Sequence, residues 1–337
     1  MTRVAVMGSG SWGTAFGMIL SDAGGDVAMW AREASVARSI DEDHVNERYH
    51  PGIPLPPAMH ATTDPAAALE GAEIVVLAVP AQSLRENLAA WLPAIAPDSI
   101  LVSLMKGIEL GTTRRMSEVI AEVAHADTSR VAVVSGPNLA REIAERQPAA
   151  TTVACADEGS ARRLQDACTT AYFRPYFTTD VVGAEIGGSV KNVIALANGM
   201  AVGLGFGENA QASLITRGLA EMTRLGVALG ANPLTFLGLA GIGDLIATCQ
   251  SPLSRNRTFG ENLGKGLTVD ETIAVTKQTC EGVKSCQPIL DLATAHGVEM
   301  PITEQVVQVV HHGMAPREML AAFMSRETRA EQGQTGF

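Results

Sequence analysis

Residues 3–14 read RVAVMGSGSWGT and decide the fold of the first half of the chain. The stretch begins with a short β-branched and apolar run, continues through Gly8, Gly10 and Gly13, and leads into an apolar helical pattern. In a dinucleotide-binding turn, the first glycine allows the tight turn, the second lets the backbone approach a pyrophosphate, and the third lets the helix pack against the strand. We therefore expect a strand, a glycine turn and a helix whose N-terminus holds the pyrophosphate.

A second strand, predicted over residues 26–30, ends close to the position that selects the cofactor. An NAD site usually has Asp or Glu there to bind the ribose 2′-hydroxyl, whereas Arg32 stands near that position and suits a 2′-phosphate. Glu33 is adjacent, so a solvent-exposed surface arginine is the alternative interpretation.

Five further apolar or β-branched runs predict strands of the same sheet, at residues 73–80, 99–105, 131–134, 151–154 and 172–177. The near-continuous apolar runs among them are typical of a parallel sheet that is covered on both faces. The last two runs flank a predicted helix over residues 160–170 and extend the sheet.

Ligands of such sheets bind beyond the carboxyl ends of the strands. Lys106 follows one predicted strand, and the turn 135–138, which contains Gly136 and Asn138, follows the next. Both turns point at the same crevice, so Lys106 is a candidate binding residue. An ordinary surface lysine is the alternative.

Residues 41–63 contain three irregularly spaced histidines and four prolines. Irregular spacing is a poor signal for metal binding, and a proline-rich segment is typical of a loop. We predict a surface loop and no metal site.

The second half of the chain is organised around residues 185–207, with Lys191 at their centre. At 3.6 residues per turn, residues 185–203 are apolar or small on nearly every side, which predicts a buried helix. Gly187 and Gly188 lie one turn from the lysine and predict a recess on its face. We interpret Lys191 as a desolvated amine that faces a ligand and performs acid/base chemistry. A lysine that snorkels from a helix end is the alternative.

A polar, glycine-bearing stretch over residues 241–257 interrupts the helical patterns. Asp244 follows two glycines and either caps the next helix or takes part in a site. Arg255 and Asn256 supply a planar fork of donors and an amide, a combination that holds phosphate. With the two lysines named above, Arg255 would make a local positive site for a small anion.

The predicted fold is α/β, with an N-terminal Rossmann-type doubly wound, mostly parallel sheet followed by an all-helical C-terminal domain. We place the dinucleotide-binding domain at residues 1–182, the helical substrate and catalytic domain at 183–325, and a flexible tail at 326–337. Helices of the second domain are predicted at residues 185–203, 211–230, 245–248, 267–275, 286–296 and 302–311.

The composition of the chain argues against several classes of protein. A chain of 337 residues that is 46% hydrophobic and 18% charged can bury two cores. Its net charge of −11 argues against a nucleic-acid partner. Five cysteines without a CxxC pair suggest neither a disulfide framework nor a zinc site, and they fit reduced thiols in the cytoplasm. The first apolar run is too short for a signal peptide, and no long apolar stretch predicts an integral membrane segment.

The motifs, in order, resemble those of the bacterial NAD(P)-dependent glycerol-3-phosphate dehydrogenases. They are GSGSWGTA at 8–15, Lys106-Gly107, Gly136-Pro137, Lys191-Asn192, GIGD at 241–244 and LSRNR at 253–257. The resemblance spans nearly the whole chain, from residue 3 to residue 325, and LSRNR is much more specific than the glycine fingerprint.

This resemblance implies an enzyme that reversibly reduces dihydroxyacetone phosphate to sn-glycerol 3-phosphate with NADPH or NADH, and so supplies glycerophospholipid synthesis. It implies that Lys191 is the proton acceptor. The implied substrate contacts are Lys106, Gly136, Asn138, Lys191, Asp244, Ser254, Arg255 and Asn256. The implied cofactor contacts are Gly8, Gly10, Ser11, Trp12, Gly13, Arg32, Lys106, Ala140, Arg255, Thr279 and Glu281.

Two positions depart from the family pattern. Asn138 stands where the family usually has a serine, and it can still donate a hydrogen bond but is larger. Thr279 stands where valine is common. The oligomeric state cannot be read from the sequence, and a homodimer remains open.

In the expected mechanism, the nicotinamide delivers a hydride to C2 of the ketone and Lys191 protonates the developing alkoxide. Arg255 and Asn256 hold the phosphate and thereby orient the substrate. Replacing Lys191 by alanine should leave no buried charge behind. Two alternatives remain open: a related hydroxyacid dehydrogenase, which would have no use for a phosphate fork, and a non-catalytic dinucleotide sensor.

Overall fold

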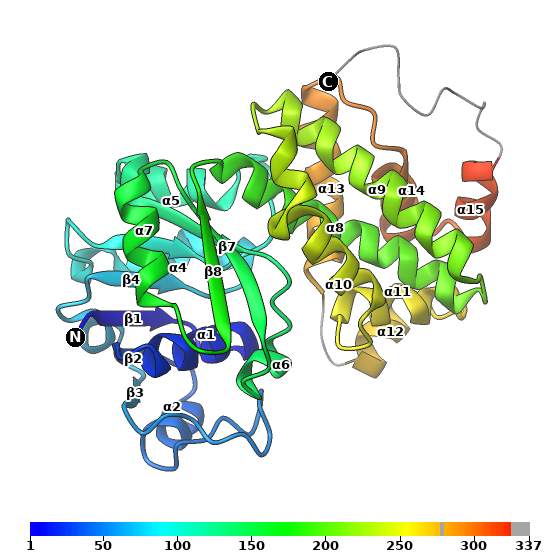
Figure 1. Cartoon of the computed structure of the whole chain (residues 1–337). Helices are drawn as coiled ribbons and strands as arrows, with labels where there is room; N and C mark the ends of the chain where they lie inside the picture. The colour runs from blue at the N-terminus through cyan, green and yellow to red at the C-terminus, as the bar shows by residue number, and fades with distance from the viewer. Residues whose placement is uncertain (277–279, 325–337) are drawn as a thin grey trace. The chain divides into compact units, whose positions relative to one another are not determined.

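The computed structural model describes residues 1–276 and 280–324. The chain divides into two compact units, Met1–Glu185 and a second unit that begins at Ile186. Figure 1 shows the sheet and its helices in the first unit and an all-helical arrangement in the second.

The first unit is built on an eight-stranded sheet with the order β3-β2-β1-β4-β5-β6-β7-β8. Its strands are β1 (Arg3–Met7), β2 (Asp26–Trp30), β3 (Met59–Thr62), β4 (Ile74–Leu77), β5 (Ile100–Ser103), β6 (Val131–Ser135), β7 (Ala149–Cys155) and β8 (Phe173–Thr178). Neighbouring strands pair in parallel, except that β6 and β7 are antiparallel. The sequence-based prediction of a mostly parallel sheet, extended by its last two strands, is confirmed.

Helices cover both faces of this sheet because its strands are apolar on both sides. In β1, Val4 and Val6 join the core under α1, whereas Ala5 and Met7 join the core under α3, α4 and α5. The helices of this unit are α1 (Ser11–Asp22), α2 (Ala34–Asp41), α3 (Pro65–Leu69), α4 (Leu84–Trp91), α5 (Met116–Ala124), α6 (Ala140–Ala144) and α7 (Glu158–Ala167). Short helical turns are η1 (Ala81–Ser83), η2 (Leu92–Ala94) and η3 (Thr128–Arg130).

The predicted surface loop at residues 41–63 is wrong in two respects. Its last part forms β3, which pairs with β2 at the sheet edge although only Met59 of the four residues is buried. Its middle part buries Asn46 and His50, at 1% and 0% exposure. A polar four-residue edge strand has almost no apolar pattern to reveal it, and buried polar side chains are accommodated only through tertiary hydrogen bonds.

The second unit is helical throughout its described part. Its elements are α8 (Val181–Gly203), which starts in the first unit, α9 (Glu208–Ala228), η4 (Pro233–Leu237), η5 (Leu239–Gly243), α10 (Asp244–Gln250), α11 (Arg255–Gly264), α12 (Val269–Thr276), α13 (Glu281–Ala295), α14 (Pro301–His312) and α15 (Pro316–Met324). Every residue of α8 from Gly183 to Ala201 is buried, so the predicted buried helix is confirmed.

Both ends of α8 have a local cause. The side chain of Asp180 accepts a hydrogen bond from the N–H of Gly183 at 2.9 Å and caps the first turn. At the other end, Gly205 takes the left-handed conformation with φ +82°, and the N–H of Phe206 closes on the carbonyl of Ala201 at 3.0 Å. This is the usual way in which a glycine ends a helix.

Some helix boundaries differ from prediction. Helix α13 begins at Glu281 rather than at residue 286, and it contains Pro288 in its interior. Its first turn starts early because the side-chain oxygen of Asn256 accepts a hydrogen bond from the N–H of Gly282 at 2.9 Å. Helix α15 was not predicted. Within residues 1–276 and 280–324, no helix is long and apolar enough to cross a membrane.

Candidate active site

The glycine turn of the first unit has the geometry that the sequence predicts. Gly8 has φ +134°, and a Cβ there would lie 2.4 Å from the carbonyl oxygen of Ala78. A Cβ on Gly13 would lie 2.2 Å from the carbonyl oxygen of Gly8. Only glycine fits at these two positions, because such contacts are far below van der Waals distance.

Gly10 is different, because its surroundings are open. It precedes α1 as the N-cap residue without a side-chain cap, and a Cβ there would meet no described atom within 4 Å beyond its chain neighbours. The first turn of α1 contains no acidic residue. The helix N-terminus therefore presents N–H groups to an open space, which is the arrangement that binds a pyrophosphate.

Two buried polar residues brace this turn from the segment between α2 and β3. The side-chain amide of Asn46 donates to the carbonyl of Ser9 at 3.1 Å and to the hydroxyl of Thr14 at 2.9 Å. His50 Nε2 lies 2.7 Å from the carbonyl oxygen of Ser11. Burial lowers the pKa of His50, while this backbone hydrogen bond opposes the shift. The neutral ring donates from Nε2, and the sequence offered no signal for either contact.

The residues that follow the turn also suit a bound dinucleotide. Trp12 packs on Phe16 with ring centroids 5.4 Å apart, and its indole N–H is buried without a hydrogen-bond partner in the described chain. Ser11 is half-buried beside it, and Ala140 opens α6 and packs against the same core. An orphaned buried donor beside an open helix N-terminus fits the predicted cofactor.

Arg32 lies two residues beyond the end of β2. Its side chain is 82% exposed, and a guanidinium nitrogen lies 4.0 Å from the carboxylate of Glu33. Contact with a 2′-phosphate therefore stays a prediction.

Lys106 stands beyond the end of β5 and reaches the neighbouring turn. Its ammonium donates to the carbonyl of Gly136 at 3.0 Å. Gly136 has φ +155°, and a Cβ there would lie 3.0 Å from the hydroxyl oxygen of Thr151 on β7. The two turns that the sequence placed at one crevice are thus in direct contact.

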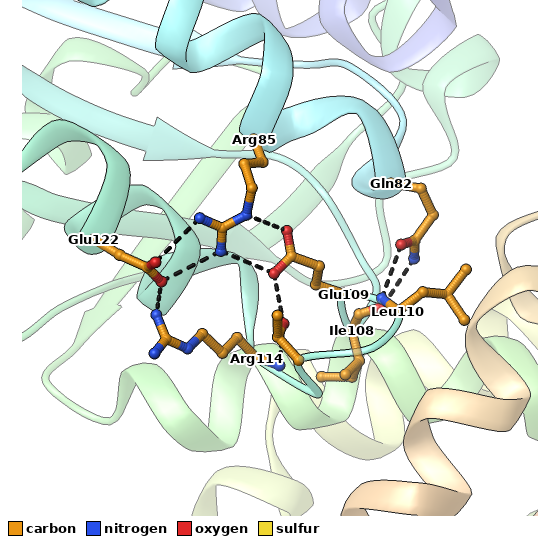
Figure 2. A network of polar contacts seen from close by, with 8 residues as sticks. Gln82, Arg85, Ile108, Glu109, Leu110, Arg114 and Glu122 are labelled. Carbon is orange, nitrogen blue, oxygen red and sulfur yellow. Dashed lines mark hydrogen bonds and ion pairs between the residues drawn. The ribbon is translucent and has the colours of Figure 1, made fainter.

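A polar network holds the loop that begins with Lys106 (Figure 2). Arg85 on α4 binds the carboxylate of Glu109 through two hydrogen bonds of 2.9 and 3.0 Å and that of Glu122 on α5 through two of 3.1 and 3.2 Å. The side-chain amide of Gln82 donates to the backbone at residue 108 and accepts from residue 110. The pKa of Glu109 is lowered chiefly by its hydrogen bond to Arg85. The position of the lysine therefore depends on a network that sequence reasoning missed.

Asn138 uses its extra length in a contact with β7. Its side-chain amide donates to the hydroxyl of Thr151 at 3.0 Å, and that hydroxyl donates to the carbonyl of Ser135 at 3.2 Å. The amide oxygen of Asn138 is buried without a described hydrogen-bond partner. A serine is too short to make the same reach, so the departure from the family pattern has a structural role here.

Lys191 is buried on α8, with 6% of the residue exposed. Its ammonium is paired with the carboxylate of Asp244 and donates to the hydroxyl of Thr248 at 2.7 Å. That hydroxyl donates in turn to Asp244 at 3.2 Å. The lysine therefore does not snorkel. Asp244 does not cap α10 either, because Gly243 occupies the N-cap position and the aspartate side chain faces the lysine.

At Gly187, the structure does not leave the recess that was predicted beside Lys191. A Cβ on Gly187 would lie 2.2 Å from the carbonyl oxygen of Ala240 in η5. The glycine therefore allows the backbone that precedes Asp244 to approach α8 closely. Close packing, rather than an empty face, brings the carboxylate to the amine.

The phosphate-binding candidates gather at the N-terminus of α11. The hydroxyl of Ser254 caps the helix by accepting from the N–H of Arg257 at 3.3 Å, and the exposed Arg255 is the first helical residue. Asn256 is buried, and its amide donates to the side-chain oxygen of Asn192 on α8 at 2.9 Å. Asn256 therefore joins α8, α11 and the first turn of α13.

Helices α8 and α11 touch through glycines that sequence reasoning did not single out. A Cβ on Gly199 or Gly203 would lie 2.1 or 2.2 Å from a backbone oxygen of α11. A Cβ on Gly260 or Gly264 would lie 2.1 or 2.3 Å from a backbone oxygen of α8. Each helix thus carries a Gly-x₃-Gly pair, the spacing that places both glycines on one face, and this spacing was the available signal.

Glu281, a predicted cofactor contact, is the first residue of α13 and is half-buried. Thr279 lies outside the described residues. The predicted roles of both stay predictions.

Glu185 anchors the first turn of α8 within the first unit. Its buried carboxylate accepts from a guanidinium N–H of Arg115 at 2.6 Å, from the N–H of Ser117 at 2.7 Å and from the hydroxyl of Ser117 at 2.5 Å. Burial raises the pKa of Glu185, and these donors oppose the rise. The first turn of α8, which belongs to the first unit, is therefore attached to the start of α5.

A glycine turn at the end of β1 and a buried lysine–aspartate pair on a helical unit define a dehydrogenase that uses a nicotinamide dinucleotide. Family models described as the N-terminus and the C-terminus of NAD-dependent glycerol-3-phosphate dehydrogenase match residues 3–161 and 180–321. The chain belongs to the family of NAD-dependent glycerol-3-phosphate dehydrogenases.

Individual relatives agree with this assignment. The chain is 63% identical to the glycerol-3-phosphate dehydrogenase [NAD(P)+] of Streptomyces griseus over 98% of each chain, and 63% identical to that of Thermobifida fusca over 98% of this chain and 99% of the relative. The crystal structure of glycerol-3-phosphate dehydrogenase from Coxiella burnetii superposes with a TM-score of 0.91 at 36% identity, over 96% of this chain and 99% of that one.

Proposed function

We propose that this chain catalyses the reversible reduction of dihydroxyacetone phosphate to sn-glycerol 3-phosphate with NADPH or NADH. The observation that carries the proposal is the buried ammonium of Lys191, held between the carboxylate of Asp244 and the hydroxyl of Thr248. A buried amine fixed by two partners is a placed proton donor, in a helix whose other charged residue, Glu185, lies in its first turn.

The bound nicotinamide supplies the hydride. Lys191 donates its proton to the alkoxide oxygen that forms at C2, and in the oxidising direction the neutral amine takes that proton back. Asp244 and Thr248 orient the amine throughout, because both contact its nitrogen. A placed acid/base group of this kind contributes about a hundredfold to ten-thousandfold in rate.

The glycine turn would hold the cofactor. Gly8 and Gly13 shape the turn, Gly10 leaves the space open, and the N–H groups at the start of α1 would meet the pyrophosphate. Trp12 offers its buried indole N–H on the same side of the sheet core.

The N-terminus of α11 would hold the substrate phosphate. The guanidinium of Arg255 supplies paired donors, and the helix N-terminus adds a favourable dipole. Ser254 and Asn256 have their side chains committed to α11 and to Asn192, so we assign them chiefly to shaping this site. Lys106, Gly136 and Asn138, which belong to the first unit, are likewise proposed as substrate-binding residues.

We further propose that the enzyme works in the cytoplasm and that its product serves as the backbone of glycerophospholipids. Five buried free thiols suit a reducing compartment. A homodimer stays a prediction, which sedimentation equilibrium would test.

The decisive experiment is a spectrophotometric assay at 340 nm with dihydroxyacetone phosphate and either NADPH or NADH. We expect turnover with the phosphorylated ketone and little turnover with dihydroxyacetone, because the phosphate supplies remote binding energy. Equal turnover with both ketones would contradict the proposed phosphate site. Cofactor binding without any turnover would instead favour a dinucleotide sensor.

A further inference from the structure

Glu33 follows β2 where a dinucleotide-binding sheet usually carries its ribose-binding acid, yet an arginine from another segment holds its carboxylate. A guanidinium nitrogen of Arg48 lies 2.5 Å from the Glu33 carboxylate, whereas the nearest nitrogen of Arg32 lies at 4.0 Å. Arg48 comes from the segment between α2 and β3, fifteen residues further along the chain. Two guanidinium groups therefore approach one carboxylate.

A shallow cavity of about 260 Å³ lies beside this ion pair. Its lining residues come from α2 and from the segment that follows it: Glu33, Ser35, Val36, Ser39, Asn46, Glu47 and Arg48. The lining combines serine hydroxyls and the ion pair with a second carboxylate, that of Glu47, which accepts from the N–H of Gly52 at 3.2 Å. Within this lining, the serine hydroxyls and the guanidinium of Arg48 are the groups that can bind a hydroxylated, anionic ligand.

The backbone that carries Arg48 is fixed to the cofactor turn on both sides. Two residues earlier, Asn46 donates to the carbonyl of Ser9 and to Thr14. Two residues later, His50 contacts the carbonyl of Ser11 at 2.7 Å. Because Asn46 and His50 are both fully buried, Arg48 is presented from a braced segment rather than from a free loop.

We propose that Arg48 is a specificity-determining residue for the cofactor, which binds the 2′-phosphate of NADPH together with Arg32 and neutralises Glu33 when that phosphate is absent. The inference rests on the proposed function, because it assigns the ribose end of the same cofactor. With NADH, the carboxylate of Glu33 accepts a hydrogen bond from the ribose 2′-hydroxyl. With NADPH, the two guanidinium groups bind the phosphate, and their charges offset the repulsion by Glu33.

The test uses the full-length protein and two nucleotides that lack nicotinamide, 2′,5′-ADP and 5′-AMP, with affinities measured by isothermal titration calorimetry at low salt. Arg48→Met keeps much of the side-chain bulk and removes the charge. We expect it to weaken 2′,5′-ADP about tenfold, the usual effect of losing one charge-assisted hydrogen bond, and to change 5′-AMP less than about twofold.

Arg38→Met is the matched control, because Arg38 is an exposed arginine on α2 that does not line the cavity. It should change neither affinity. The proposal would be overturned if Arg48→Met lost the same affinity for both nucleotides, or if it lost no affinity for 2′,5′-ADP. Melting curves identify a variant that has lost its fold. Arg48→Lys keeps the charge, so it should bind 2′,5′-ADP more tightly than Arg48→Met does if the effect is electrostatic.

Glu33→Gln separates the two roles further. It should weaken 5′-AMP, because a carboxylate acceptor for the 2′-hydroxyl is lost, and should leave 2′,5′-ADP as tight or tighter. If Glu33→Gln instead weakened the binding of 2′,5′-ADP and left that of 5′-AMP unchanged, the proposal would also be overturned. None of these titrations requires turnover, so a failed ketone assay and a failed nucleotide preference are distinguishable results.

Discussion

The carboxylate of Asp244 decides what happens when Lys191 is removed. Asp244 is 1% exposed and is paired with the lysine ammonium, so a variant that removes only the amine takes a cation away from a buried anion. The sequence-based expectation that no buried charge would be left behind is therefore wrong. Removing one member of a buried pair costs about 3–5 kcal/mol.

We predict that Lys191→Met lowers the turnover number about a hundredfold to ten-thousandfold and also lowers the melting temperature. The double variant Lys191→Met/Asp244→Asn removes both charges and should regain stability without regaining activity. Single-turnover hydride transfer at 340 nm and a melting curve on each variant make the measurement. A single variant that keeps half the wild-type rate would remove Lys191 from the mechanism.

At Arg255, lysine retains the charge but not the planar fork. We predict that Arg255→Lys raises the Michaelis constant for dihydroxyacetone phosphate with little change in stability, because the side chain is exposed at the first residue of α11. Steady-state kinetics at saturating cofactor measure the effect. Wild-type kinetics would show that the phosphate binds elsewhere.

At the scale of single elements, the sequence predicted those whose cause is local. The glycine turn could be predicted because Gly8 and Gly13 have no sterically allowed replacement. Helix α8 could be predicted because apolar residues lie on all sides of the helix. The partner of Lys191 could not be identified, because Asp244 is 53 residues away in the chain. The brace from Asn46 and His50 was equally hidden, since no periodicity accompanies a buried polar contact.

The packing of α11 on α8 depends on the absence of side chains at the contact. A Cβ on Gly260 would lie 2.1 Å from the carbonyl oxygen of Leu196, which is backbone and cannot move aside. We predict that Gly260→Ala destabilises the protein by about 1–3 kcal/mol, the usual range for overpacking, and weakens substrate use by shifting α11.

Gly207→Ala is the matched control for this variant. Gly207 has an ordinary negative φ of −81°, and a Cβ there would meet no described neighbour within 4 Å. Denaturant unfolding and the Michaelis constant for dihydroxyacetone phosphate should both stay near wild type in the control. Equal effects in the two variants would refute the role of the helix contact.

Helix α14 has its N-terminus capped from another helix. The carboxylate of Glu221 on α9 accepts from the N–H of Ile302 at 2.6 Å and from that of Thr303 at 3.3 Å. Burial raises the pKa of Glu221 to about 7, and these donors oppose the rise. Because the folded-state pKa exceeds the ordinary value of 4.5, the associated stability is present below pH 4.5 and is lost as the pH rises through about 7.

We predict that the stability of the wild type relative to Glu221→Gln falls by roughly 3 kcal/mol between pH 4.5 and pH 7.5. Glutamine keeps the acceptor oxygen and removes the titration. Chemical denaturation of both proteins across this range measures the difference. If the stability of the wild type relative to Glu221→Gln rose with pH instead, the donors at the helix N-terminus, rather than burial, would set the pKa of Glu221.

Across the whole molecule, all five cysteines are free and buried. Burial raises the pKa of Cys280 to about 11 and those of Cys168, Cys249 and Cys286 to about 12, and it raises that of Cys155. We predict that, on average, less than about one thiol per molecule of native protein reacts promptly with a disulfide reagent at pH 8. All five should react after unfolding in guanidinium, and prompt reaction of several native thiols would contradict the burial.

The organisation of the whole chain was the easiest feature to predict from the sequence. The strands of a mostly parallel sheet and the helices of a helical unit space their apolar residues differently along the chain. The last two strands followed from β-branched runs such as residues 151–154. Helix α15 was not predicted, because its 9 residues span too few turns to show a clear helical period.

The glycine contact between α8 and α11 also has a consequence for the ketones that the proposed site would accept. Side chains in an ordinary helix interface change rotamer when neighbouring residues vary, whereas two backbones in contact have nothing to adjust. The backbones that carry Lys191 on α8 and Arg255 at the start of α11 are therefore held at a fixed spacing. If Lys191 and Arg255 contact the substrate as proposed, a ketone whose carbonyl lies one carbon farther from its phosphate would fit the two groups less well, so helix spacing would contribute to selectivity for carbon-chain length.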